Sequence, residues 1–340
     1  MKKLSTLILL SFFATAASAQ IFPDKKLHVS VVPIFSYSVG QLGEEIYYSA
    51  NPSKRISELE WERNIFLFGA NADIKYRQFK WSIGAASSLF EQKSGDMRDS
   101  DWLNESDYSM KTTYSVGTNN AVANYELTTS FSYDFDATSF VSFSPIIAVM
   151  YDYDSFERRD AEGWYSSDRK HWWYDDSSTH YPYTYWNDEK GRYVTRRLAG
   201  IDIFRHSLFT WLGFSTKIKP FSKVNFDFEI LLSPFSYFYA IDTHHAKNTN
   251  GEWWEKHYKM KQLSYFNFLS LSPRVNFIIN SIFELSLETS YTFNFESARG
   301  SLFLDFWEDD PQDEFYKSGQ DSGMSLENFT VTLGIKIKIF

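Results

Sequence analysis

Three long stretches of the chain alternate regularly between apolar and polar side chains. The stretch "VNFDFEILL" (224–232) has an apolar residue at every second position, with Asn225, Asp227 and Glu229 between them. "FELSLETSYTFNFE" (283–296) and "VTLGIKIKIF" (331–340) show the same pattern. Because successive side chains of a strand point to opposite faces, this period predicts β-strands with one apolar face. A soluble β-sandwich alternates as well, but these runs exceed the ~5–6 residues of a typical globular strand, which favours a barrel.

The whole chain divides into ten such segments. We expect strands near residues 26–42, 55–75, 80–93, 112–134, 139–156, 195–218, 223–240, 260–278, 282–298 and 325–340. Every second connection is short ("KYRQF", "FDAT", "KPFS", "INS"), whereas the others are long, polar and aromatic. An even strand count with short turns at one end and long loops at the other is typical of outer-membrane proteins. The predicted fold is therefore all-β, a ten-stranded antiparallel transmembrane β-barrel with short periplasmic turns and long extracellular loops.

The N-terminal residues predict export. Lys2 and Lys3 precede an apolar run from Leu7 to Phe13, and "ASA" (17–19) follows as a small-residue cleavage site. This is the pattern of a secretory signal peptide, which we assign to residues 1–19. Residues 20–340 are then a single barrel domain, and no later stretch approaches the ~20 consecutive apolar residues of a transmembrane helix.

The amino-acid composition limits the classes of molecule that the protein is expected to bind. Aromatic residues make up 19% of the chain, as membrane-interface girdles require, and there is no cysteine. Without the two lysines of the signal peptide, 32 basic residues stand against 43 acidic ones, a net charge of −11. Nucleic acid is thereby disfavoured as a partner, whereas cationic ligands would be attracted.

Two short stretches carry groups suited to acid–base chemistry. "GDMRDSDWLN" (95–104) contains Asp99 and Asp101, and "AIDTHH" (240–245) contains Asp242 and His244. They follow the third and seventh predicted strands at the same end, nearly opposite each other in a ring of ten. Because residues two apart on a strand point the same way, each pair can face inward and the pairs can meet.

Such a cluster could activate water without a serine or cysteine nucleophile. A carboxylate beside a histidine fixes its tautomer and raises its basicity, and facing carboxylates can hold the water. Other interpretations remain open: the first pair could be solvated or bind calcium weakly, and the second could bind a metal. No third metal ligand occurs at a regular spacing, so no metal site is predicted.

The same stretches resemble the omptin family. "GDMRDSDWLN" is similar to its Asp-x-Asp-Trp signature and "DTHH" to its Asp-x-His, and further agreement occurs in "KRISELEW" (54–61), "WSIGAA" (81–86) and "ENFTVTLGIKIKIF" (327–340). Omptins are outer-membrane aspartic-type endopeptidases of Gram-negative bacteria with the active site at the extracellular end of a ten-stranded barrel. The resemblance implies the same fold, the same location and a hydrolase that acts on peptides or proteins.

The resemblance also implies roles for single residues. His244 would activate the water, Asp242 would orient His244, Asp99 would hold the water and Asp101 would support Asp99. Glu44, in "GEEIYY", matches a glutamate that binds basic side chains of the substrate.

The chain also departs from the family pattern. Where the family has a second acidic residue, this chain has Ala240, which places the preference for paired basic residues in question. Many omptins require lipopolysaccharide for activity, so this lipid is an expected partner, with no other cofactor. The family's lipopolysaccharide-binding arginine beyond the fifth strand has no clear match. Arg158 and Arg159 lie nearby, in a stretch that we expect to be a solvated loop.

Two other functions remain open. A catalytically silent barrel could act as an adhesin or receptor through its loops, although all four acid–base positions are occupied. A pore is a third hypothesis, but a ten-stranded barrel is narrow and its interior is expected to be filled by side chains.

Overall fold

The computed structural model describes residues 27–165, 193–198, 200–247, 253–305 and 315–339. The predicted signal peptide, residues 1–19, lies outside them. The strands are β1 (Leu27–Tyr47), β2 (Arg55–Glu62), β3 (Ile65–Tyr76), β4 (Phe79–Ser87), β5 (Gln92–Asp101), β6 (Thr113–Tyr133), β7 (Phe135–Asp136), β8 (Val141–Tyr165), β9 (Tyr193–Leu198), β10 (Ile201–Phe221), β11 (Val224–Lys247), β12 (Trp253–Ser264), β13 (Phe268–Ile278), β14 (Phe283–Asn294), β15 (Ala298–Asp305) and β16 (Phe315–Lys338). The described residues include no helix long and apolar enough to cross a membrane.

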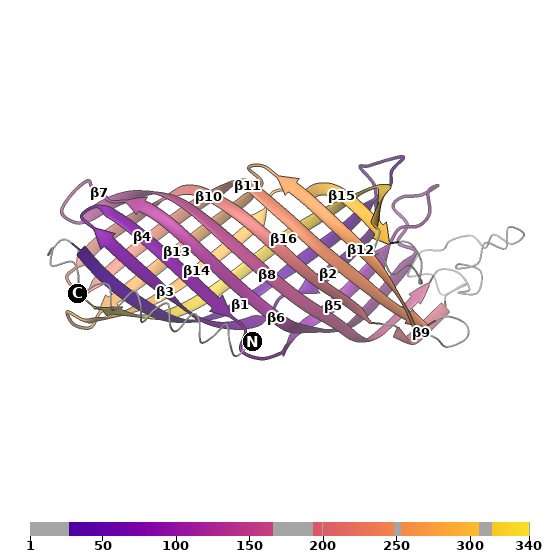
Figure 1. Ribbon diagram of the computed structural model, residues 1–340, viewed down its shortest axis with the longest axis horizontal. Helices are drawn as coiled ribbons and strands as arrows, with labels where there is room; N and C mark the ends of the chain where they lie inside the picture. Colours follow the sequence, from indigo (N-terminus) through magenta and orange to yellow (C-terminus); the bar gives the residue numbers. More distant parts are fainter. Residues whose placement is uncertain (1–26, 166–192, 199, 248–252, 306–314, 340) are drawn as a thin grey trace, which may run out of the picture.

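The sheet closes into an antiparallel ring because β16 pairs with β1 as well as with β14. The ring has ten positions. Five are filled by the single strands β1, β6, β8, β11 and β16, and five by the consecutive pairs β2/β3, β4/β5, β9/β10, β12/β13 and β14/β15. Figure 1 shows these strands tilted along the length of the barrel. The predicted ten-stranded antiparallel transmembrane barrel is confirmed.

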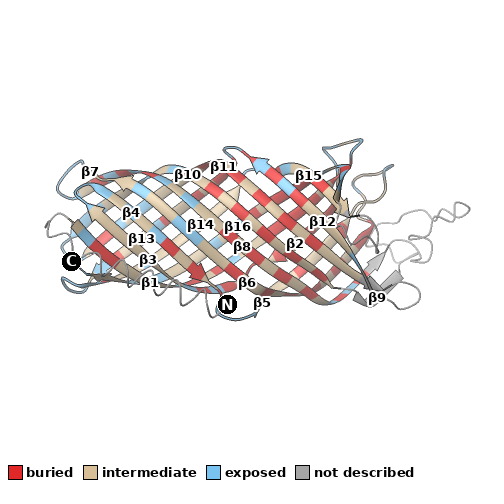
Figure 2. Cartoon of the chain, viewed as in Figure 1, coloured by how far each residue is buried: buried red, intermediate tan, exposed pale blue. Residues whose placement is uncertain are grey.

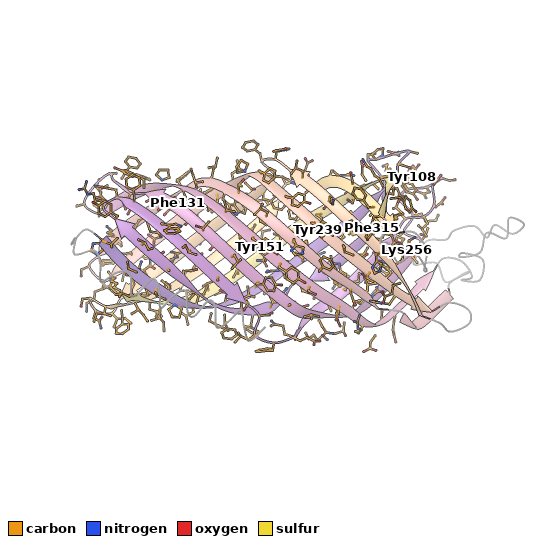
Figure 3. All side chains as sticks on the ribbon, viewed as in Figure 1. Tyr108, Phe131, Tyr151, Tyr239, Lys256 and Phe315 are labelled. Carbon is orange, nitrogen blue, oxygen red and sulfur yellow. The ribbon has the colours of Figure 1, made fainter. Side chains whose placement is uncertain are left out.

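Large apolar side chains project from the outer wall over one half of the barrel. Phe131, Ile147 and Phe214 are 58%, 61% and 48% exposed. Exposed segments gather in the half that carries β7 and the C-terminus (Figure 2), and Phe131 lies there (Figure 3). Tyr151 and Tyr239 lie on the outer wall nearer the middle (Figure 3). An apolar band edged by aromatic residues is the surface of a barrel that spans a membrane.

Several strands run farther than the alternating pattern predicts. β1 ends at Tyr47 instead of near residue 42, β8 at Tyr165 instead of 156, and β11 at Lys247 instead of 240. The prediction was too short because the outer face becomes polar beyond the band, while the backbone ladders continue. The barrel therefore extends well past the membrane on the side opposite the C-terminus.

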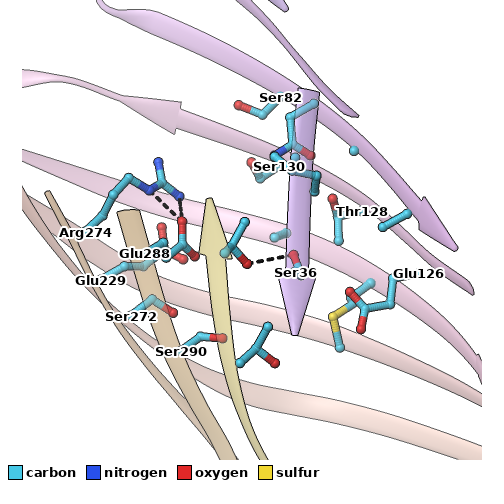
Figure 4. Close-up of a pocket in the computed structure, with 18 of the residues that line it drawn as sticks. Ser36, Ser82, Glu126, Thr128, Ser130, Glu229, Ser272, Arg274, Glu288 and Ser290 are labelled. Atoms are coloured by element: carbon cyan, nitrogen blue, oxygen red, sulfur yellow. Dashed lines mark hydrogen bonds and ion pairs between the residues drawn. The ribbon is translucent and has the colours of Figure 1, made fainter. Parts of the chain in front are cut away.

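The interior of the membrane-spanning half is polar. A cavity of ≈ 390 Å³ there is lined by serine, threonine and charged side chains (Figure 4). The charges are paired: Arg274 binds Glu288, and Lys336 Nζ lies 3.0 Å from Asp73 Oδ2. Ion pairs are tolerated here because the lumen, unlike the outer wall, does not face lipid.

A packed layer separates this cavity from the other end of the barrel. Its fully buried aromatic side chains are Trp61, Phe156, Phe209, Phe238 and Phe268. Beside them, Asp154 accepts hydrogen bonds from Arg63 Nε at 3.0 Å and from Arg205 Nη2 at 3.0 Å. These three side chains are each about 1% exposed. The layer forms a floor beneath the region where the acid–base residues lie.

Candidate active site

The two acidic stretches lie on strands that face each other across the barrel. Asp99 and Asp101 are among the last three residues of β5, and Asp242 and His244 lie near the end of β11. β5 belongs to the third position of the ring and β11 is the seventh. The prediction put all four residues just after their strands. They lie within the strands, because β5 remains paired with β2 and β6, and β11 with β12.

Asp242 and His244 form a hydrogen-bonded pair. His244 Nε2 lies 2.7 Å from Asp242 Oδ2. Asp242 is 3% exposed, whereas the His244 side chain is 30% exposed, so the pair is anchored below and open above. The ring of Tyr258, on β12, lies 4.9 Å from the imidazole between centroids. With Nε2 held by the carboxylate, Nδ1 is the nitrogen that can exchange a proton with a bound molecule.

Electrostatic coupling joins the two walls of the site. Burial lowers the pKa of His244, but the charge and hydrogen bond of Asp242 and the charge of Asp99 together raise it above its ordinary 6.5. Burial, and then the charge of Asp99, raises the pKa of Asp101 to about 7, although Ser57, Thr113 and His244 act in the opposite direction. The charges of Asp99 and Asp242 thus act on His244 and Asp101, so the four predicted side chains share one environment.

A fifth charged side chain belongs to this cluster. Arg158, on β8, is 3% exposed, and its Nη1 lies 3.7 Å from Asp99 Oδ2 and 2.9 Å from Ser115 Oγ on β6. Arg159 points to the opposite face, where it binds Glu157 at 2.7 Å and Asp202. The expectation that both arginines lie in a solvated loop was wrong, because β8 continues past them. Extending the alternation from the buried Phe156 would have placed Arg158 inside the barrel.

Glu44 lies deeper, on β1, opposite Leu59 and Met324 in the register. It is 2% exposed, and neither carboxyl oxygen has a hydrogen-bond partner among the described residues. Burial, and then the charge of Asp242, raises its pKa well above the ordinary range, while the charge of Arg205 acts against this. Glu44 is thus a buried acceptor just below the Asp242–His244 pair, without a cation bound to it.

The described part of the chain contains no group of three or more His, Cys, Asp or Glu side chains placed to hold a metal ion. His245, next to the pair, faces the outer wall and binds Asp202 at 2.8 Å and Glu255 at 3.1 Å. The inward-facing cluster accordingly consists of carboxylates, one imidazole and one guanidinium.

Comparisons with known proteins agree with this architecture. The model of the Omptin family matches residues 28–339. The crystal structure of the outer membrane protease OmpT from Escherichia coli matches with a TM-score of 0.74 at 14% identity, covering 92% of this chain and 96% of that one. The translocator domain of the autotransporter NalP from Neisseria meningitidis reaches only 0.33 at 7% identity, covering 99% and 97% of the two chains. No curated protein matches.

The closed ten-stranded barrel with its apolar outer band defines a bacterial outer-membrane protein, and the family match narrows the class to the outer-membrane proteases. The chain belongs to the omptin family. The predicted family and the predicted location in the bacterial outer membrane are confirmed.

Proposed function

We propose that the protein is an aspartic-type endopeptidase that uses a water activated by the Asp242–His244 pair. The observation that carries this proposal is the 2.7 Å contact between His244 Nε2 and Asp242, with Asp99 and Asp101 facing it from the opposite wall. The cluster is partly open above and closed below, as a site for a peptide bound across the barrel mouth must be.

The proposed reaction needs no covalent intermediate. His244 takes a proton from water through Nδ1 while Asp99 holds that water, and the hydroxide adds to the peptide carbonyl carbon. The protonated His244 then gives its proton to the leaving amine. Asp242 orients the imidazole and stabilises its charged form, as the carboxylate does in other hydrolytic sites. Asp101 supports Asp99 and accepts part of the proton traffic.

Cleavage of a mixed peptide library by the refolded protein tests this proposal. Asp99→Ala and His244→Ala should abolish cleavage, whereas Asp96→Ala, on the outward side of the same strand, should leave it intact. Activity that survives both inward substitutions would refute the mechanism. A folded wild-type barrel that cleaves nothing, with or without lipopolysaccharide, would favour an adhesin or receptor instead.

Cationic peptides are the proposed substrates. The predicted mature chain carries a net charge of −11, and Glu44 is a buried carboxyl group beside the pair whose oxygens have no hydrogen-bond partner among the described residues. A buried acceptor gains most from a charged donor that reaches it, so a lysine or arginine beside the scissile bond would be favoured. Ala240 adds no second carboxylate, which limits the proposal to a single basic residue.

Lipopolysaccharide is the proposed lipid partner and activator. On the outer wall, Lys259 Nζ lies 3.9 Å from the centroid of Phe315, and Lys261 Nζ 5.5 Å from that of Phe303. Leu263, two residues farther along β12 toward the membrane, is exposed. Lysines on aromatic rings just beyond the apolar band suit the phosphates of an anionic lipid. Lys259→Ala/Lys261→Ala should raise the lipopolysaccharide concentration needed for half-maximal cleavage, and an unchanged requirement would exclude this patch.

The site is proposed to face the extracellular side. β1 starts and β16 ends at the opposite end of the barrel, and termini of such barrels lie in the periplasm. Because the chain has no cysteine, single introduced cysteines can report the orientation. On intact cells, a membrane-impermeant maleimide should label Ser106→Cys, at the site end, and not Ala137→Cys, in the opposite turn. The reverse result would contradict the proposal.

A further inference from the structure

Arg158 is a buried cation in the candidate active site to which the proposed mechanism gives no task. It lies on β8, inside the barrel, and its guanidinium reaches Asp99 on β5 and Ser115 on β6. A third contact, 3.5 Å to Met97 Sδ, fixes the side chain from below. Burying a guanidinium is unfavourable unless its charge is compensated, so its presence here requires an explanation.

The charges around His244 supply that explanation. Asp242, on the same strand, and Asp99, across the lumen, both raise the pKa of His244, whereas Arg158 lowers it. Asp101 faces the same space from β5, and Lys256 lies opposite His244 on β12, with its Nζ 5.1 Å from the centroid of the Tyr258 ring. The charges of Asp242 and Asp99 alone would favour the protonated imidazole, and a protonated imidazole cannot accept a proton from water.

We propose that Arg158 is a positioning residue for peptide hydrolysis, which holds the Asp99 carboxyl group directed at the water and sets a positive charge against the carboxyl groups that surround His244. The contact at 3.7 Å pairs the guanidinium with the Asp99 carboxyl group, and the bond to Ser115 fixes the direction from which the guanidinium approaches. The water between Asp99 and His244 thereby meets an acceptor on each side. This assignment rests on the proposed protease function.

Two substitutions separate the charge of Arg158 from its shape. Arg158→Gln keeps a polar side chain that can still bind Ser115 but removes the charge. Arg158→Lys keeps the charge but loses the planar guanidinium group with its several N–H donors. Arg159→Gln is the matched control, because Arg159 lies next in the chain and faces the outer wall. Folding of each variant is checked by far-ultraviolet circular dichroism and by the heat-dependent shift of the barrel on gels.

The readout is kcat and KM for one cleaved peptide between pH 5 and 9. In Arg158→Gln we expect kcat to fall by about 10²-fold at unchanged KM, because a small misplacement of reacting groups has this effect. The acidic limb of the pH–rate profile of Arg158→Gln should move to higher pH, since this variant lacks the cation that lowers the pKa of His244. Arg158→Lys should keep the wild-type limb with a smaller loss of kcat, and Arg159→Gln should match the wild type.

An acidic limb that stays in place in Arg158→Gln would overturn the proposal and leave Arg158 a purely structural side chain. If that variant does not fold, Arg158→Lys decides, because a displaced limb in a variant that keeps the charge would equally overturn it. Failure of the protease function is a different result: the wild-type barrel cleaves no peptide, or Asp99→Ala and His244→Ala have no effect. Either of these would remove the Arg158 assignment as well.

Discussion

At the scale of single residues, the candidate active site places several carboxyl groups close to one imidazole. Asp99, Asp101 and Asp242 surround His244, and Glu44 lies below them with no hydrogen-bond partner for either oxygen in the part of the chain that the structure describes. Burial raises the pKa of Asp101 to about 7, and the charges of Asp242 and Asp99 raise the pKa of His244, so both groups can exchange protons near neutral pH. Two consequences can be measured directly.

The first concerns pH. His244 must be neutral to accept a proton, so kcat/KM should rise with pH through a limb that lies above 6.5, the ordinary pKa of histidine. Asp242→Asn removes the negative charge that raises this pKa and leaves only a neutral acceptor for the hydrogen bond, so the limb should move to lower pH while the rate falls. Profiles of kcat/KM from pH 5 to 9 measure both. The control is Asp96→Asn, whose side chain is 48% exposed on the outward face, and an unmoved limb in Asp242→Asn would contradict the assignment of the base.

The second concerns Glu44. Glu44→Gln keeps the shape of the side chain and removes the carboxylate, so peptides with lysine or arginine beside the scissile bond should lose roughly 10–100-fold in kcat/KM, as for a hydrogen bond to a charged group. Peptides with neutral residues there should be cleaved as before. The adjacent Glu45, which already binds Tyr47, supplies the control Glu45→Gln. Equal losses on basic and neutral peptides would show that Glu44 serves structure and not selection.

At the scale of elements, the strands of the site end are joined by side chains as well as by their ladders. Asp154 of β8 links Arg63, between β2 and β3, to Arg205 of β10, and it also accepts from Asn124 Nδ2 on β6 at 2.9 Å. This arrangement ties separate ring positions together just below the candidate active site. Buried ion pairs contribute little net stability when intact, but losing one partner leaves charges uncompensated.

Asp154→Ala should therefore lower the free energy of unfolding by about 3–5 kcal/mol, because the buried Arg205 would lose its carboxylate partner and Arg63 would keep only Asp152 and Glu126. Urea unfolding of the refolded barrel in lipid vesicles measures the change. Asp136→Ala, in the exposed strand β7, should change it by no more than ~0.5 kcal/mol. A decrease in the free energy of unfolding as small as that of Asp136→Ala would mean that water compensates the positive charges of the two arginines.

At the scale of the whole molecule, the barrel has a polar lumen in the membrane and a candidate active site beyond it, with a closed layer between them. The aromatic floor and the Arg63–Asp154–Arg205 network lie between the ≈ 390 Å³ cavity and the site. Water and ions in the lumen are thus kept apart from the acid–base cluster. The pore hypothesis requires this layer to open.

Planar bilayers containing the refolded protein should accordingly show no stable channel steps. The reason is steric, since Phe209, Phe238 and Phe268 pack with ring centroids 5.1–5.4 Å apart on one side of the floor, and Trp61 and Phe156 stack at 6.2 Å on strands farther around the ring. Bilayers exposed to the same buffer and detergent alone serve as the comparison. Reproducible steps that scale with salt concentration would show that the floor opens and would revive the pore hypothesis.

The sequence by itself determined the architecture of this protein, because alternation with period two, strand length and the order of short and long connections are local properties of the chain. It also placed the acidic pairs on opposite walls, since ring position follows from strand order. The sequence-based strand ends were too early, and Arg158 was therefore assigned to a loop. The alternating pattern is lost where a strand continues into water, because both of its faces then carry polar residues. The tertiary structure alone decided that Arg158 contacts Asp99, that Glu44 is buried with no hydrogen-bond partner among the described residues, and that a packed floor closes the barrel. Each of these depends on side chains from distant strands meeting inside a closed ring, which no local pattern in the sequence records.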